Sequence, residues 1–270
     1  MSARALEKPA GLPNLSLTTT TEIIPRDAAS ALDDLARRYT RAGGVGLQVL
    51  NLVGTQAENL LERLPDPVKT QLETATERAL GIALDAAVQS RKRVGDAPAW
   101  LNRAATTAMG AAGGFGGLPS ALAELPVTTT VLLRAIQGIA ADYGYDPDTP
   151  EIRAECLSVF AAAGPLEHDD GANMAFLSAR VTLTGATVHG VIARIAPRLA
   201  TVLGQKLAAQ TVPVVGAVAG AATNYAYTSY YQEMAHVHFG LKKIADQYDM
   251  SREDLARQLQ ARMSTPTRTK

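Results

Sequence analysis

The stretch LAAQTVPVVGAVAGAATNYAYTSYYQ, residues 207–232, contains no charged side chain over 26 residues. In a chain of which 19% is charged, such a gap marks a surface that folding or a membrane keeps away from water. A second charge-free window covers the 20 residues 104–123. Both windows are richer in Ala and Gly than in Leu and Ile, which favours tight helix packing or shallow lipid contact over a plain membrane-spanning helix.

Neither window is an unbroken apolar run of the roughly 20 residues that a spanning helix needs. The first 25 residues are polar and Thr-rich and lack the apolar centre of a signal peptide. The single cysteine, Cys156, excludes an internal disulfide and agrees with a reducing compartment. We therefore expect a cytoplasmic location, either free or peripheral on the inner face of the membrane.

Composition and periodicity predict an all-α fold. The chain has 48 Ala among its 270 residues, and Ala has the highest intrinsic helix propensity. Apolar residues recur at spacings of three and four, and no convincing alternating run indicates a strand. Helices are expected over approximately residues 27–39, 47–61, 66–93, 124–142, 150–160, 175–182, 188–207, 231–244 and 251–259. Pro126 is expected to start a helix or to kink one.

The expected architecture is one compact multi-helix bundle whose central helices are the Ala/Gly-rich segments. A single domain should cover residues 26–263, between flexible tails at 1–25 and 264–270. Glycines four residues apart, as at Gly110 and Gly114 or Gly216 and Gly220, leave a flat groove on one side of a helix. Such a groove serves either a close helix crossing inside the protein or helix association in lipid.

Four tyrosines, Tyr225, Tyr227, Tyr230 and Tyr231, cluster near the end of the first window. Tyrosine is amphipathic and prefers boundaries, so these rings either close the rim of the core or contact lipid headgroups or a partner.

Four polar residues stand in apolar surroundings: Glu124, Arg134, Asn224 and His238. Buried polar groups need partners, so one interpretation is a network that locks the central helices. The functional interpretation makes Glu124 and His238 an acid/base pair at a pocket, or a site for a polar headgroup. The candidate catalytic residues are thus Glu124 and His238, and the candidate binding residues are Arg134, Asn224, Tyr225, Tyr227 and Tyr231.

No other chemistry is indicated. His236 and His238 are two apart and would point away from each other on a helix, and the acidic loop around His168 is either solvated or a site for a hard metal. Cys156, on an apolar helical face, is expected to be an inert core thiol. With 26 basic and 26 acidic residues the chain lacks the basic excess that nucleic-acid binding needs. We expect no metal, no cofactor and no nucleic-acid partner.

Three segments resemble the bacterial EcsC family: AELPVTTTVLLRAIQGIAADYG (123–144), EIRAECLSVFA (151–161) and KLAAQTVPVVGAVAGAATNYAYTSYYQEMAHVHFGLKKIADQYD (206–249). The resemblance extends from about residue 30 to about residue 260, and its specific positions are Pro213, Gly216, Gly220, Ala221, Asn224, Tyr227, Ala235, His238 and Phe239. Near the end of this motif the family's acid and basic pair is replaced by Lys242-Lys243, so no role is inferred there.

The resemblance implies a membrane-proximal helical protein. The family is named for a protein encoded beside an ABC transporter linked to secretion, so an ABC transporter is an implied partner, but no reaction is implied. The leading hypothesis is therefore a non-enzymatic protein that binds lipid or a membrane partner near a transport or secretion system. The alternatives are a hydrolase acting on lipid or peptide through Glu124 and His238, and a scaffold that binds another protein.

Overall fold

The computed structural model describes residues 25–42, 66–96, 98–115, 117–161, 187–209 and 213–264. All regular elements in these ranges are helices, which confirms the all-α class. They are an N-terminal helix at residues 26–42 and the elements α2 (Asp66–Val94), α3 (Ala99–Phe115), α4 (Gly117–Asp142), α5 (Pro150–Ser158), the short 3-10 helix η1 (Val159–Ala161), α7 (Val188–Ala209), α8 (Pro213–Tyr248) and α9 (Arg252–Ser264).

Local signals placed several helix starts correctly. Thr149 caps α5, because its hydroxyl accepts a hydrogen bond from the backbone N–H of Ile152 at 3.4 Å, and Pro150 follows at the first helical position. Ser251 caps α9 in the same way, with the backbone N–H of Asp254 at 3.3 Å. These contacts satisfy N–H groups that the first turn of a helix leaves without an intrahelical partner.

Two helices are longer than expected. Helix α4 begins at Gly117, so Pro126 lies inside it and does not start it. Proline removes one hydrogen bond to the carbonyl four residues earlier, and the remaining turns continue the helix. Helix α8 has 36 residues and joins the charge-free stretch from Pro213 to the His- and Lys-containing segment that follows it.

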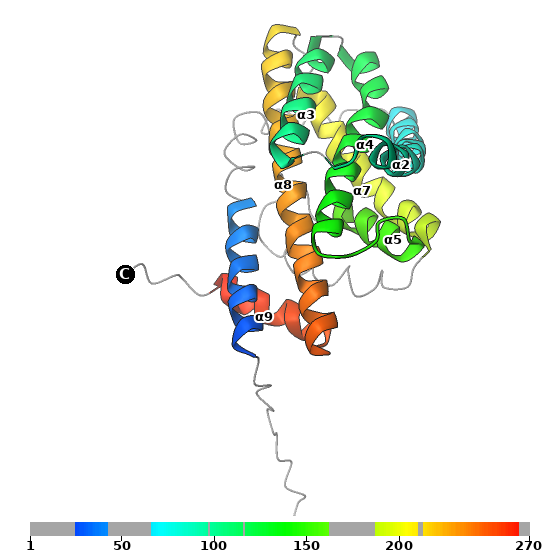
Figure 1. The fold of residues 1–270 in the computed structure, drawn as a ribbon. Coiled ribbons are helices and arrows are strands. Elements are labelled where there is room, and N and C mark those ends of the chain that lie inside the picture. Colours follow the sequence, from blue (N-terminus) through cyan, green and yellow to red (C-terminus); the bar gives the residue numbers. More distant parts are fainter. Residues whose placement is uncertain are drawn as a thin grey trace, which may run out of the picture.

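Helix α8 forms the axis of the described bundle (Figure 1). Helix α3 packs along its N-terminal half, more extensively than any other pair of described elements. The N-terminal helix lies along its C-terminal half, where Arg38 binds Glu233 at 2.9 Å. Helices α4, α2 and α7 lie on the other side, and α9 crosses the C-terminal end of α8 (Figure 1). The larger parts of the two charge-free windows, residues 104–115 and 213–232, thus come together in the α3–α8 pair.

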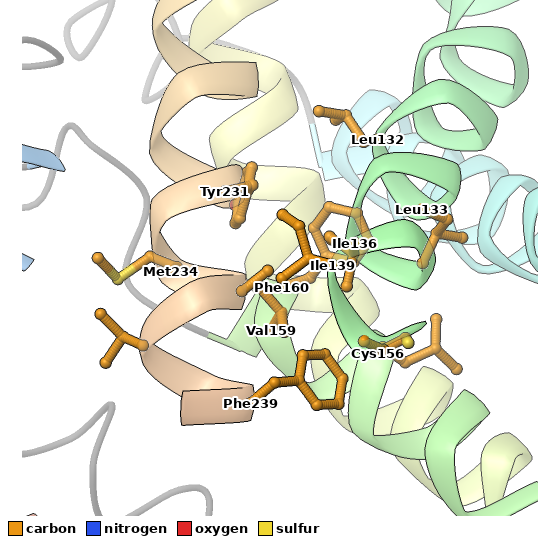
Figure 2. Packing of buried hydrophobic residues seen from close by; sticks show 14 of the residues in the cluster. Leu132, Leu133, Ile136, Ile139, Cys156, Val159, Phe160, Tyr231, Met234 and Phe239 are labelled. Carbon is orange, nitrogen blue, oxygen red and sulfur yellow. The ribbon is translucent and has the colours of Figure 1, made fainter. Parts of the chain in front are cut away.

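The apolar core lies between α4, α5, η1 and α8 (Figure 2). Ile136 of α4 lies near Phe160 of η1 and Tyr231 of α8, whereas Leu133 points away from them on the other side of α4 (Figure 2). All four side chains are fully buried. The rings of Phe160 and Tyr231 meet edge to face with centroids 4.9 Å apart, a favoured aromatic geometry. Helix α4 is therefore a central helix of the described bundle.

Several expectations fall outside the described residues. They are the helices at 47–61 and 175–182, the acidic loop around His168, and nearly all of the tails at 1–25 and 264–270. The domain bounds at 26 and 263 remain predictions for the same reason. Among the described helices, none combines the length and the apolar character needed to cross a bilayer.

Candidate functional site

The interface between α3 and α8 is a polar seam set between small residues. The side-chain N–H of Asn224 donates to the carbonyl oxygen of Thr106 at 2.7 Å, and the hydroxyls of Thr106 and Thr228 share a hydrogen bond of 2.7 Å. All three side chains are buried. Buried polar groups are tolerated when they are paired, so these bonds also fix the register of the two antiparallel helices.

At one end of the seam the two backbones nearly touch. A methyl group built on Gly110 would lie 2.6 Å from the side-chain nitrogen of Asn224 and closer still to the carbonyl oxygen of Gly220. Only glycine fits at such a crossing. The glycine spacing alone left open whether this groove packs against another helix of the protein or contacts lipid. At Gly110 and Gly220 it packs against another helix of the protein.

At the other end, Gln232 joins α8 to the start of α3. Its amide nitrogen donates to the carbonyl oxygen of Ala99 at 3.1 Å, and its amide oxygen accepts from Arg103 at 2.7 Å. On α8 the partners Gly220, Asn224, Thr228 and Gln232 follow at intervals of four residues, which places them on one side of the helix.

A second polar cluster joins three helices around His238. The Nε2 atom of His238 lies 2.5 Å from a carboxylate oxygen of Glu155 in α5, and the other oxygen of Glu155 accepts from Arg252 of α9 at 2.9 Å. The side chains of His238 and Glu155 are 1% and 11% exposed. Burial opposes the charge on Glu155, but the neighbouring His238 and Arg252 outweigh it and hold the pKa of this carboxyl well below its usual range.

The carboxylate that meets His238 is therefore Glu155, whereas the sequence had suggested Glu124. The ring of His236 packs against Tyr143, just after α4, with centroids 5.9 Å apart, so this part of α8 lies level with the end of α4. Glu124 lies 18 residues before Asp142 in α4, on the order of 25 Å along the helix axis. Only the backbone of Glu124 belongs to the described part of the chain. This geometry does not bring the two residues of the suggested acid/base pair together.

Arg134 belongs to neither cluster. It extends from α4 to the end of α2, where its guanidinium donates to the hydroxyl of Ser90 and to the carbonyl oxygen of Gly95. It thus holds the corner between α2 and α3 against α4.

The tyrosine cluster is divided between core and surface. Tyr227, Tyr230 and Tyr231 are buried and pack on one another, with the centroids of Tyr230 and Tyr231 5.4 Å apart. Burial raises the pKa of Tyr227 well above its ordinary value. Only Tyr225 of the four is exposed. Most of the cluster therefore occupies the core and leaves little aromatic surface for lipid.

The opposite face of α3 is apolar and exposed. Asn102, Thr106 and Gly110 face α8, whereas the residues on the other side of the helix carry no charge and lie in solvent: Trp100, Leu101, Ala104, Ala105, Ala108 and Ala112. We call these six residues the outer face of α3. Sequence reasoning treated the window as one surface, whereas one side of α3 packs on α8 and the other side is exposed.

Cys156 lies in the core, as expected. Its side chain is fully buried and its pKa is raised, chiefly by that burial, so it is held as a thiol. Within the described ranges, no three His, Cys, Asp or Glu side chains are grouped so that they could hold a metal ion.

The fold and its clusters define a class: an all-α bundle organised on one long axial helix. That helix has a polar seam along residues 220–232 and, nearer its C-terminal end, a buried carboxylate–imidazole–guanidinium cluster at His238. The sequence profile of the EcsC protein family matches residues 22–243, more than half of the chain. The protein belongs to the EcsC protein family. No curated protein and no solved structure was found to match the chain.

Proposed function

We propose that this EcsC-family protein acts as a peripheral protein on the inner face of a membrane and binds lipid there through the outer face of α3. The observation that carries the proposal is the exposed, charge-free surface of that helix. Soluble proteins rarely leave a contiguous apolar surface open to water unless it binds something. Trp100, at 63% exposure, gives this surface an aromatic ring of the kind that prefers a membrane–water interface.

The neighbouring helix α4 has another exposed apolar side chain at this level. Val127 of α4 is 53% exposed and lies ten residues after the start of α4, while Ala105 lies ten residues before the end of α3. Because α3 and α4 are consecutive and pack on each other, these two positions are level. The outer face consists mainly of alanine, and such short side chains suit shallow contact with lipid because they cannot reach deep into the bilayer.

The hydrolase alternative has less support. A general base must reach a proton of the substrate, but the side chain of His238 is 1% exposed and its Nε2 atom is engaged by Glu155. The other oxygen of Glu155 accepts a hydrogen bond from Arg252, so this carboxylate joins α5 to both α8 and α9. The cluster is better explained as a structural contact that holds α5, α8 and α9 together.

Liposome flotation tests the proposal. We expect the purified protein to rise with protein-free vesicles, and Ala108→Glu on the outer face of α3 to weaken this binding about tenfold or more, because a charge must then approach the bilayer. The matched control is Ala193→Glu, which places the same charge on an exposed alanine of α7.

Two outcomes would contradict the proposal. A protein that stays at the bottom of the gradient with every lipid composition does not bind lipid, and a scaffold would then be favoured. A protein that rises only with native membranes, and not with protein-free vesicles, binds a membrane protein such as a transporter subunit.

A further inference from the structure

The corner between α2 and α3 is exposed. Every described residue from Lys92 to Leu101 is exposed, and the chain turns at Gly95 with a φ of 72°. Three of these exposed residues are large and apolar: Val94 at 77%, Trp100 at 63% and Leu101 at 44% exposure. Moving such exposed apolar side chains out of water and into an apolar environment is energetically favourable.

Cations surround this apolar tip. Arg91, Lys92 and Arg93 form the last turn of α2, and Arg134 reaches the carbonyl oxygen of Gly95 from α4. Two carboxylates compensate part of the charge: Asp96 binds Arg91 through two hydrogen bonds of 2.5 and 2.7 Å, and Asp148 binds Lys92 at 2.9 Å. Four cations and two anions leave the corner with a net charge of +2. Arg93 has no acidic partner among the described residues.

We propose that this corner is the part of the protein that docks on anionic phospholipid. Val94, Trp100 and Leu101 enter the interfacial region of the bilayer, while Arg93 and Lys92 bind the phosphates of the headgroups. The inference rests on the proposed lipid binding by the outer face of α3. It adds the charge of the lipid headgroup and states which end of α3 inserts into the bilayer. Helix α3 then lies against the membrane with its N-terminal end deepest.

A bilayer fits this corner better than another protein does. An exposed corner made of two helix ends suits a broad surface, whereas a peptide helix or strand needs a groove or a sheet edge. A second copy of the chain would bring two corners of charge +2 together about a two-fold axis, and like charges facing each other oppose association. Anionic lipid attracts the same cations, and a tryptophan beside them matches the chemistry of an interface.

The chain itself supplies the probe, because Trp100 is its single tryptophan. The test is a titration of the full chain with vesicles of phosphatidylglycerol and phosphatidylcholine, followed by tryptophan emission and by quenching with acrylamide. We expect the emission to shift to shorter wavelength and the quenching to fall. Vesicles of phosphatidylcholine alone should produce a much smaller change at the same lipid concentration.

Variants separate the two parts of the inference while keeping the tryptophan. Arg93→Glu reverses one charge and should weaken binding to anionic vesicles roughly thirtyfold, since each surface cation contributes to attraction by anionic lipid. Leu101→Glu should weaken it at least tenfold, and a glutamate is well tolerated in the first turn of a helix. The matched controls, Arg78→Glu and Ile82→Glu, lie on exposed positions of the same helix α2 far from the corner and should bind like the unaltered protein.

Failure of this inference can be told from failure of the proposed function. If Ala108→Glu weakens flotation while Arg93→Glu binds normally, and vesicles of phosphatidylcholine alone shift Trp100 emission as much as anionic vesicles do, lipid binding through the outer face of α3 stands and the corner is not a site for anionic lipid. If neither flotation nor emission changes with any vesicle, both proposals fall. An emission shift that depends on protein concentration without lipid, together with a dimer in light scattering, would assign the corner to a second copy of the chain.

Discussion

Gly110→Ala is expected to lower the free energy of unfolding by about 3 kcal/mol, at the upper end of what overpacking one methyl group costs. The added methyl would overlap the side chain of Asn224 and the backbone of Gly220. Backbone atoms cannot rotate away, so α3 and α8 would have to separate along the whole seam. The hydrogen bonds at Thr106 and Gln232 would lengthen with them.

Urea unfolding followed by circular dichroism measures this effect. The matched control is Gly81→Ala, in the middle of α2, where a methyl group would meet nothing within 4 Å. That variant should be more stable by about 0.5–1 kcal/mol, because alanine replaces glycine in a helix interior. Gly110→Ala with stability equal to that of the unaltered protein would mean that the two helices do not approach this closely in solution.

Glu155→Gln is expected to lower the free energy of unfolding at pH 7 by about 3 kcal/mol. The substitution keeps the shape of the side chain but removes the charge that His238 and Arg252 share. Arg252 would then keep its charge beside a neutral amide. The control is Glu151→Gln on the same helix, an exposed residue 3.6 Å from Lys242, which should cost at most about 0.5 kcal/mol.

The effect of Glu155 should depend on pH with a definite sign. Its pKa is lower in the folded than in the unfolded protein, so its contribution to stability is complete above the ordinary carboxyl pKa of 4.5. It is lost as the pH falls below 4.5 towards the folded pKa. The difference in unfolding free energy between the unaltered protein and Glu155→Gln should therefore shrink below pH 4.5. A difference that is constant from pH 7 to pH 3 would contradict the ionised cluster.

Local features of the sequence predicted the helices well, because their causes lie within a few residues. The start of α5 is determined locally, by the capping hydroxyl of Thr149 and by Pro150 at the first helical position. The hydroxyl of Ser251 caps α9 in the same way. The charge-free stretch predicted a central helix for the same kind of reason. An uncharged run of small residues is typical of a helix surrounded by others.

The partners across the bundle could not be predicted in this way. Glu155 and His238 are 83 residues apart, and nothing local tells which acid reaches a buried histidine. A weak signal was present: Glu155 lies three residues after buried Ile152 and directly before buried Cys156, so it borders the apolar side of α5. Likewise, Gly110 showed glycine spacing, but only the structure shows that Gly220 lies opposite.

The most direct test of a helix with one face on α8 and the other on lipid is amide hydrogen exchange with and without anionic vesicles. We expect exchange at residues 92–112 to slow when vesicles are added, while the amides of α8 remain as protected as before. If vesicle-bound protein shows no change at residues 92–112, the outer face of α3 does not contact lipid. If α3 and α8 both exchange faster on the vesicles, the seam opens and the charge-free helices leave the interior, contrary to the packing described above.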